Sequence, residues 1–220
     1  GLQTACSTPV APDLVVHTNN PAAAQAQDGV LELLLANHPL DCPVCDKGGE
    51  CPLQDRTFRF GPGQTRFVEP KRHFPKPLNL STQVAIDRER CITCYRCVRF
   101  SQDVAEDRQL TFQERGAGTE VATFTGDPYV GRFTGNIIDL CPVGALTSIP
   151  YRFVSRPWDL QNAPSICGGC PVGCNTELTQ REGELKRVTG REVPNMAVEE
   201  GWLCDKGRWG YPAAWSQDRI

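Results

Sequence analysis

Cysteine is the residue type whose abundance in this 220-residue chain indicates chemistry. The chain contains 12 Cys but only 3 His and 1 Met. Eleven of the 12 cysteines fall into three groups with different internal spacings. Grouped thiolates bind zinc or iron–sulfur clusters, whereas disulfide scaffolds are usually short secreted chains. The grouping therefore predicts metal binding in a reducing compartment.

The first ligand set lies in HPLDCPVCDKGGEC and consists of His38, Cys42, Cys45 and Cys51. Three thiolates and one imidazole within fourteen residues suit a [4Fe–4S] cluster, although a tetrahedral zinc ion accepts the same ligands. The second ring nitrogen of His38 is expected to donate to a carboxylate or carbonyl, and Asp41 is one candidate. His17 and His73 lack neighbouring thiols, so we interpret both as surface or structural residues.

The second ligand set consists of Cys91, Cys94, Cys97 and the distant Cys141, which precedes a proline. The text CITCYRC opens the bacterial ferredoxin motif C-x2-C-x2-C-x3-C-P, in which the fourth Cys of each run binds the other cluster. Ser101 occupies the fourth position of this run. Counting back from Cys141, the second run has Gly131, Thr134 and Ile137 where cysteines would stand. One cluster has therefore kept four ligands and the other has lost all four. Zinc sites seldom use three cysteines at x2-x2 spacing, so zinc is a poor alternative for this set.

The third ligand set consists of Cys167, Cys170 and Cys174, in the text CGGCPVGC, and Cys204 after a gap of 29 residues. Three clustered thiols and one distant thiol again make four possible ligands. Gly168, Gly169 and Gly173 would let backbone amides approach the sulfurs, and such N–H···S bonds influence the potential of a cluster. Zinc remains an alternative for this set.

The elements that must position these ligands are short, and the predicted fold class is α+β and loop-rich. The text VLELLLAN predicts a helix that Asp28 caps and that ends at His38-Pro39. A helix is also predicted in CVRFSQDVAE, a strand in EVATFT, and two short strands around a glycine turn in TELTQREGELKRVTG. The predicted segments are a lead over 1–27, a His/Cys domain over 28–75, a ferredoxin-like domain over 82–153 and a small β-rich domain over 164–220, with a Pro/Lys/Arg-rich linker over 69–81.

Composition argues against several other functions. The net charge of −3 suggests no nucleic-acid or anionic-membrane partner, and no apolar run is long enough to insert into a membrane. The chain has no G-x-G-x-x-G loop for a dinucleotide, and we nominate no catalytic nucleophile or general base. The opening GLQTACSTPV and the ending AAWSQDRI are expected to be internal to a longer protein.

The order of the three motifs resembles the large iron–sulfur (G-type) subunit of NADH:quinone oxidoreductase, which is respiratory complex I. The resemblance covers essentially the whole chain. It implies electron transfer through [4Fe–4S] clusters from an NADH/FMN-binding subunit toward quinone, within a proton-translocating NADH dehydrogenase. It also implies downstream iron–sulfur subunits of the peripheral arm as partners, and a cytoplasmic location on the inner face of the plasma membrane. The chain alone would hold no complete active site.

The resemblance also assigns individual residues. Cys6, in ACSTPV, is implied to be the fourth ligand of a [2Fe–2S] cluster that the full-length protein carries beside the three [4Fe–4S] clusters. Residues 1–27 would be the tail end of that [2Fe–2S] ferredoxin-like domain. The third set, with Cys204-Asp205-Lys206-Gly207, resembles the iron–sulfur subdomain of molybdopterin oxidoreductases, where a Lys at the Lys206 position lies between cluster and pterin. A large pterin-type body would follow residue 220, and the third cluster would be structural and off the main electron route.

Three other interpretations remain open. The electron-entry segment of an NAD-linked formate dehydrogenase or of a hydrogenase shares the first His/Cys loop, although such proteins usually keep both ferredoxin clusters. A zinc-stabilised interaction module would have no redox function. A disulfide-rich secreted protein is the third alternative.

Overall fold

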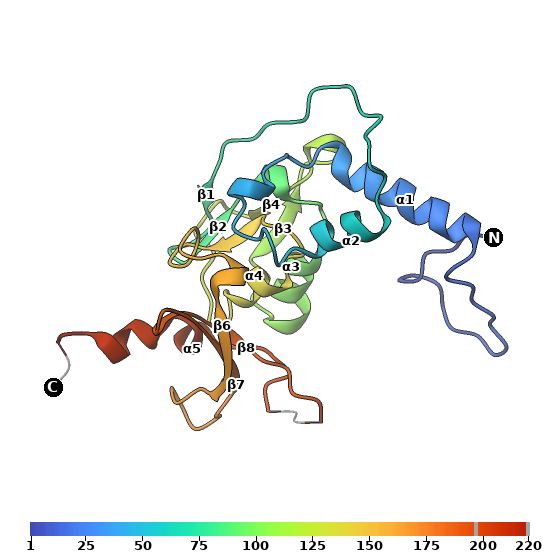
Figure 1. The fold of residues 1–220 in the computed structure, drawn as a ribbon. Helices are drawn as coiled ribbons and strands as arrows, with labels where there is room; N and C mark the ends of the chain where they lie inside the picture. The colour runs from blue at the N-terminus through green and yellow to red at the C-terminus, as the bar shows by residue number, and fades with distance from the viewer. Residues whose placement is uncertain (196–197, 219–220) are drawn as a thin grey trace.

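The computed structural model describes residues 1–195 and 198–218, so residues 196–197 and 219–220 of the predicted 164–220 domain lie outside it. Short helices and small antiparallel sheets are joined by long loops (Figure 1). The α-helices of the described residues are α1 Pro21–Ala36, α2 Pro52–Phe60, α3 Arg96–Arg99, α4 Asn136–Leu140 and α5 Asp205–Trp209. The strands are β1 Leu78–Asn79, β2 Val84–Ile86, β3 Leu110–Gln113, β4 Glu120–Thr123, β5 Leu146–Ser148, β6 Gln161–Ile166, β7 Asn175–Arg181 and β8 Glu184–Gly190. This mixed content agrees with the predicted class.

Helix α1 begins earlier than the sequence predicted. The side chain of Asn20 accepts a hydrogen bond from Ala23 N at 2.8 Å, and Pro21 occupies the first helical turn. An Asn cap followed by Pro is a strong helix start, and the alanine-rich residues after it favour helix. Asp28, the predicted cap, therefore lies exposed inside the helix. The helix ends at Ala36, close to the predicted stop before Pro39.

Two small sheets surround the second ligand set. Strand β2 pairs with both β1 and β5 in antiparallel fashion, and β3 pairs with β4 as a hairpin. The predicted helix after Cys97 is present as α3, which continues into a π-helical segment over Phe100–Val104. The predicted strand in EVATFT is present as β4. This pairing brings Cys141 and the text CITCYRC, far apart in the sequence, to one end of the sheet.

The third sheet has the order β6-β7-β8 and lies below the rest of the chain in Figure 1. Strands β7 and β8 are joined by a turn in which Gly183 has φ 81°, a conformation that glycine adopts without strain. This hairpin confirms the two strands predicted around a glycine turn. Its own apolar core is small, with Val188 and Leu203 buried beside Cys174.

Asp205, the first residue of α5, holds this third unit to the ferredoxin-like part. Its carboxylate accepts hydrogen bonds from Thr134 N at 3.0 Å, Thr134 Oγ1 at 2.7 Å and Gly135 N at 2.8 Å. Asn136 and Leu203 exchange two further hydrogen bonds of 3.0 Å across the same contact. Because Asp205 follows Cys204 directly, this contact also positions the last ligand of the third set.

The positions of the lost ferredoxin ligands are filled by protein groups. The fully buried Ser101 Oγ accepts from Gln109 N at 3.1 Å and Leu110 N at 3.2 Å, and it donates to Asp107. Ile137 is fully buried in the larger apolar core, and Thr134 binds Asp205. A hydrogen-bonded network and a domain contact therefore occupy the space where a second ferredoxin cluster would need its ligands.

Among the described residues, no helix has both the length and the apolar character needed to cross a bilayer. Helix α1, at 16 residues the longest described helix, carries charged and polar residues along its length.

We predict that Asp205→Ala loosens the third unit. The substitution leaves the amides of Thr134 and Gly135 without their acceptor, and each unsatisfied buried donor costs about 1–3 kcal/mol. We expect a lower unfolding temperature and faster proteolytic cleavage between β5 and β6, measured by calorimetry and limited digestion. Asp218→Ala, at an exposed carboxylate, is the matched control. Equal digestion rates for the two variants would contradict the role of Asp205.

Candidate metal centres

The four cysteines of the second set surround one small cavity. The cavity-lining thiols are Cys91, Cys94, Cys97 and Cys141. Cys91 follows a 3-10 turn over Arg88–Arg90, Cys97 lies in α3, and Cys141 follows α4. Apolar side chains such as Ile86 and Val143 complete the wall. The structure thus brings the predicted ligands together from two distant parts of the sequence.

The backbone of the CITCYRC loop is shaped for this convergence. Thr93 and Tyr95 have φ angles of 52° and 66°, in the left-handed region that non-glycine residues seldom adopt. Thr93 N donates to Cys91 Sγ at 3.4 Å, and the ring of Tyr95 stacks on Phe112 with centroids 4.0 Å apart. The strained turns therefore hold three cysteines around one space and direct a backbone amide at a sulfur, as cluster-binding loops do.

Burial makes the thiols of Cys91, Cys97 and Cys141 difficult to ionise without a cation. Removal from water raises the pKa of Cys91 to about 11 and that of Cys97 to about 12, and neighbouring thiols add to both shifts. Thiolates in such buried surroundings would repel one another strongly. The donor set fits an iron–sulfur core, because bound iron supplies the positive charge that keeps the sulfurs deprotonated.

The first set is assembled by the ends of α1 and α2. His38 follows α1, Cys42 and Cys45 flank the 3-10 turn over Cys42–Val44, and Cys51 precedes α2. Burial raises the pKa of Cys51, and the thiols of Cys45 and Cys42 raise it further, so these three cysteines lie close together. The close turn of the loop uses Gly49 at φ 93°.

His38 has the properties of a neutral ligand. Its Nδ1 is buried and has no hydrogen-bond partner in the described part of the chain. Burial lowers the pKa of His38, and the positive charges of Arg90 and Lys71 lower it further, so the imidazole is neutral. Such a buried nitrogen costs free energy unless something binds it, and a metal is one such partner.

Asp41 does not serve as the partner of His38 that the sequence suggested. Its carboxylate accepts hydrogen bonds from Lys76 Nζ at 2.8 Å and from Arg90 Nε at 3.1 Å. These cations come from the linker and from the turn before Cys91, so their proximity depends on the tertiary fold. His73, interpreted as a surface residue, is exposed and pairs with Glu89 at 3.1 Å.

The segment Cys141–Gly144 connects the first two sets. Cys141 belongs to the second set, while Pro142 O accepts a hydrogen bond from Cys51 Sγ at 3.6 Å. A Cβ atom on Gly144 would overlap with Cys45 Sγ, so only glycine fits against that sulfur. The first and second ligand sets therefore lie back to back across four residues, a relation that cysteine spacing did not reveal.

The third set gathers between β6, β7 and α5. Cys167 N donates to Cys174 O at 2.8 Å, and Gly169 N donates to Cys167 Sγ at 3.4 Å. Burial raises the pKa of Cys174, and the charges of Glu199, Cys167, Cys204 and Cys170 raise it further. Lys206 Nζ donates to Gly169 O at 2.9 Å and holds the ligand loop against α5. Hydrogen bonds therefore hold Cys167 beside Cys174, and Lys206 holds the ligand loop against the helix that follows Cys204.

Cys6 lies apart from these groups, exposed in a turn near the start of the chain. None of the cysteines in the described residues forms a disulfide. Over 1–195 and 198–218, no three His, Cys, Asp or Glu side chains are close enough together to hold a single metal ion.

Three family models match successive parts of the chain. Residues 27–66 match the iron–sulfur binding region of NADH-ubiquinone oxidoreductase-G. Residues 81–147 match the ferredoxin-like domain of NADH-quinone oxidoreductase subunit 3, and residues 160–213 match the Fe4S4 domain of molybdopterin oxidoreductases. Each matched range contains all four residues of one ligand set.

Curated relatives match nearly the whole chain. The G subunit of NADH-quinone oxidoreductase from Streptomyces coelicolor is 50% identical over 98% of this chain and 26% of that protein. Subunit 3 of the Thermus thermophilus enzyme is 45% identical over 100% of this chain and 29% of that protein. The chain therefore spans only about a quarter of the length of the curated relatives it matches.

A solved structure is also similar. A chain of an NAD+-reducing [NiFe]-hydrogenase in the H2-reduced state has a TM-score of 0.61 and 26% identity. The match covers 70% of this chain and 66% of that chain.

We predict that Gly144→Ala disrupts the first ligand set, because the added methyl group would displace Cys45 Sγ. Iron per chain, measured by chemical assay on the purified complex, is expected to fall by the share of one cluster, about four Fe. Gly29→Ala is the matched control, since its Cβ would meet no atom within 4 Å. Unchanged iron in Gly144→Ala would show that Cys45 is not constrained at this contact.

Proposed function

We propose that the chain is an electron-transfer segment holding three [4Fe–4S] clusters, because nearly its whole length is similar to part of the G subunit or subunit 3 of NADH-quinone oxidoreductases. The observation that carries the proposal is the back-to-back packing of the first two ligand sets across Cys141–Gly144. Each bound cluster would accept and donate one electron. The chain would then contribute to an oxidoreductase without an active site of its own.

The ligand assignment follows the four-residue groups. The first cluster would be held by His38, Cys42, Cys45 and Cys51, the second by Cys91, Cys94, Cys97 and Cys141, and the third by Cys167, Cys170, Cys174 and Cys204. We assign these clusters to segments 28–75, 82–153 and 164–220. Segment 1–27 with Cys6 would contribute the fourth ligand of a [2Fe–2S] cluster whose remaining ligands are not among these residues.

The protein groups would set the potential of each cluster. Thr93 N and Gly169 N direct backbone dipoles at sulfurs of the second and third sets, and apolar side chains line the cavity of the second set. Hydrogen bonds to sulfur and limited solvent access are two of the means by which a protein adjusts cluster potential. No proton transfer is required of any residue.

Partners and location follow from the same premise. We propose that an NADH/FMN-binding subunit supplies electrons and that other iron–sulfur subunits of the peripheral arm carry them toward quinone, in a proton-translocating complex. The segment would lie on the cytoplasmic, inner face of the plasma membrane. The third cluster, attached through Asp205, would have a structural function.

A second candidate is the electron-entry segment of an NAD-linked hydrogenase, which the similarity to the NAD+-reducing [NiFe]-hydrogenase favours. The identity of 26% to that chain is well below the 50% shared with the Streptomyces coelicolor protein. NADH-dependent reduction of quinone, and no uptake of H2 by the assembled complex, would support the first candidate.

The composition of the metal centres tests the proposal directly. Three [4Fe–4S] clusters predict about twelve Fe and an equal amount of acid-labile sulfide per chain after anaerobic purification or reconstitution. A colourless protein with bound zinc would contradict it. Cys97→Ser is expected to remove one cluster signal from the EPR spectrum, whereas Cys6→Ser should leave all three [4Fe–4S] signals.

We predict that His38→Cys lowers the potential of the first cluster while keeping it assembled. A thiolate in place of neutral imidazole adds one negative charge beside the iron, which disfavours reduction. Redox titration followed by EPR measures the shift. His17→Cys, at an exposed histidine, is the matched control. An unchanged potential in His38→Cys would exclude His38 as a ligand.

A further inference from the structure

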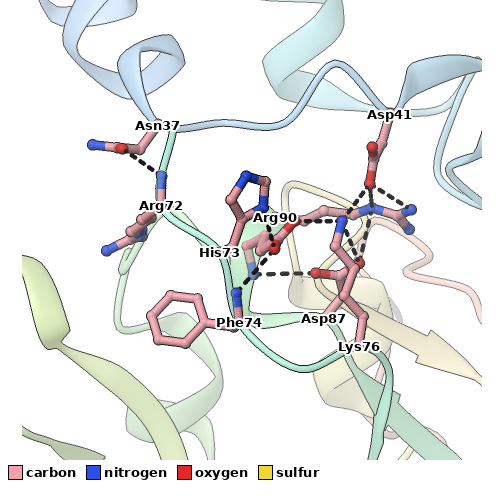
Figure 2. A network of polar contacts seen from close by, with 9 residues as sticks. Asn37, Asp41, Arg72, His73, Phe74, Lys76, Asp87 and Arg90 are labelled. Atoms are coloured by element: carbon pink, nitrogen blue, oxygen red, sulfur yellow. Dashed lines mark hydrogen bonds and ion pairs between the residues drawn. The ribbon is translucent and has the colours of Figure 1, made fainter. Parts of the chain in front are cut away.

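A network of charged residues joins the first ligand set to the ferredoxin-like part. Figure 2 shows Arg90 and Lys76 facing Asp41 and Asp87. Arg90 Nη2 donates to Asp41 Oδ2 at 3.0 Å, and Arg90 Nε lies 3.3 Å from Asp87 Oδ2. Lys76 Nζ lies 2.8 Å from Asp41, 3.6 Å from Asp87 and 2.5 Å from Glu89. The carboxylates of Asp41, from the first ligand segment, and of Asp87, from the ferredoxin-like segment, thus hold the guanidinium of Arg90 in place.

Arg90 reaches from the second ligand set to the first. Arg90 directly precedes Cys91 in the sequence. A Cβ atom added to Gly144 would overlap with Cys45 Sγ and would lie 3.6 Å from Arg90 Cδ, so the side chains of Arg90 and Cys45 are neighbours. The side chain of Arg90 is only 7% exposed. Its charge acts on both Cys45 and His38, two members of the first set. A permanent cation therefore stands at a proposed cluster in surroundings that screen it poorly.

We propose that Arg90 is a residue that sets the potential of the first cluster, because its fixed guanidinium stabilises the additional electron of the reduced form. This inference rests on the proposed first cluster. The cation comes from the neighbouring segment, so its effect depends on how the two segments dock. Asp41 has the opposite effect, since its carboxylate is anchored beside the same ligands.

Lys76 provides the appropriate comparison. It carries the same formal charge within the same network but is 30% exposed and is surrounded by the carboxylates of Asp41, Asp87 and Glu89. Asp41 and Asp87 also contact Arg90, so Lys76 differs from Arg90 in having a third carboxylate partner, Glu89, and in being more accessible to water, which screens its charge. If a positive charge anywhere in the network were enough to set the potential of the first cluster, replacing Lys76 and replacing Arg90 would shift that potential equally.

The test is redox titration of the assembled full-length complex with EPR detection of each cluster. Arg90→Gln is expected to shift the first cluster to a more negative potential, whereas Arg90→Lys should shift it less because the charge is retained. Asp41→Asn should shift it in the positive direction. Lys76→Gln should produce a smaller shift than Arg90→Gln.

An unchanged potential in Arg90→Gln, with the cluster signal present, would overturn the inference while leaving the proposed function intact. A shift of equal size in Lys76→Gln would overturn it as well. Should Arg90→Gln fail to assemble, Arg90→Met, which keeps an unbranched side chain but removes the charge, replaces it: a shift to a more negative potential supports the inference, and no shift overturns it. Absence of iron from the unaltered protein would instead refute the proposed function.

Discussion

Thiols buried in apolar surroundings are the constraint on which the rest of the structure depends. Cys51, Cys97 and Cys141 belong to the main hydrophobic core rather than to its surface. Neutral thiols can occupy such positions, but thiolates need a compensating positive charge at their centre. For the proposed clusters, folding and metal binding are consequently coupled, because the same side chains serve as core residues and as ligands.

Charged contacts between segments complement this small core. Arg187 pairs with Glu50 through two hydrogen bonds of 2.8 Å, which ties β8 to the residue before Cys51. Arg208 of α5 pairs with Asp139 of α4, close to Cys141. Each pair joins the third unit to a residue close to a ligand of another set, since Glu50 precedes Cys51 and Asp139 lies two residues before Cys141. The arrangement of the three sets is thus held by directional contacts as well as by apolar packing.

Local patterns in the sequence predicted local structure well. The turn at Gly183, the helix after Cys97 and the strand β4 all follow from residue type and spacing within a few positions. The predicted start of α1 at Asp28 was wrong, because the helix begins after Asn20, whose side chain caps it and which a proline follows.

Contacts between distant residues could not be predicted in this way. Asp41 was expected near the His38 ring, but the fold places Arg90, 49 residues later in the sequence, against its carboxylate. The cysteine spacing indicated which thiols group together. It contained no information on how close one group lies to the next, because that depends on where Pro142 and Gly144 pack.

The four residues from Cys141 to Gly144 also constrain motion. Cys141, at one end of this segment, is a member of the second ligand set. Gly144, at the other end, packs against Cys45 Sγ of the first set. The two proposed centres are therefore connected through this segment, and a shift of its backbone would displace ligands of both. The rate of electron tunnelling falls steeply as the distance between donor and acceptor grows. A segment that fixes the distance between the two proposed clusters would keep the rate of electron transfer between them constant when other parts of the protein move.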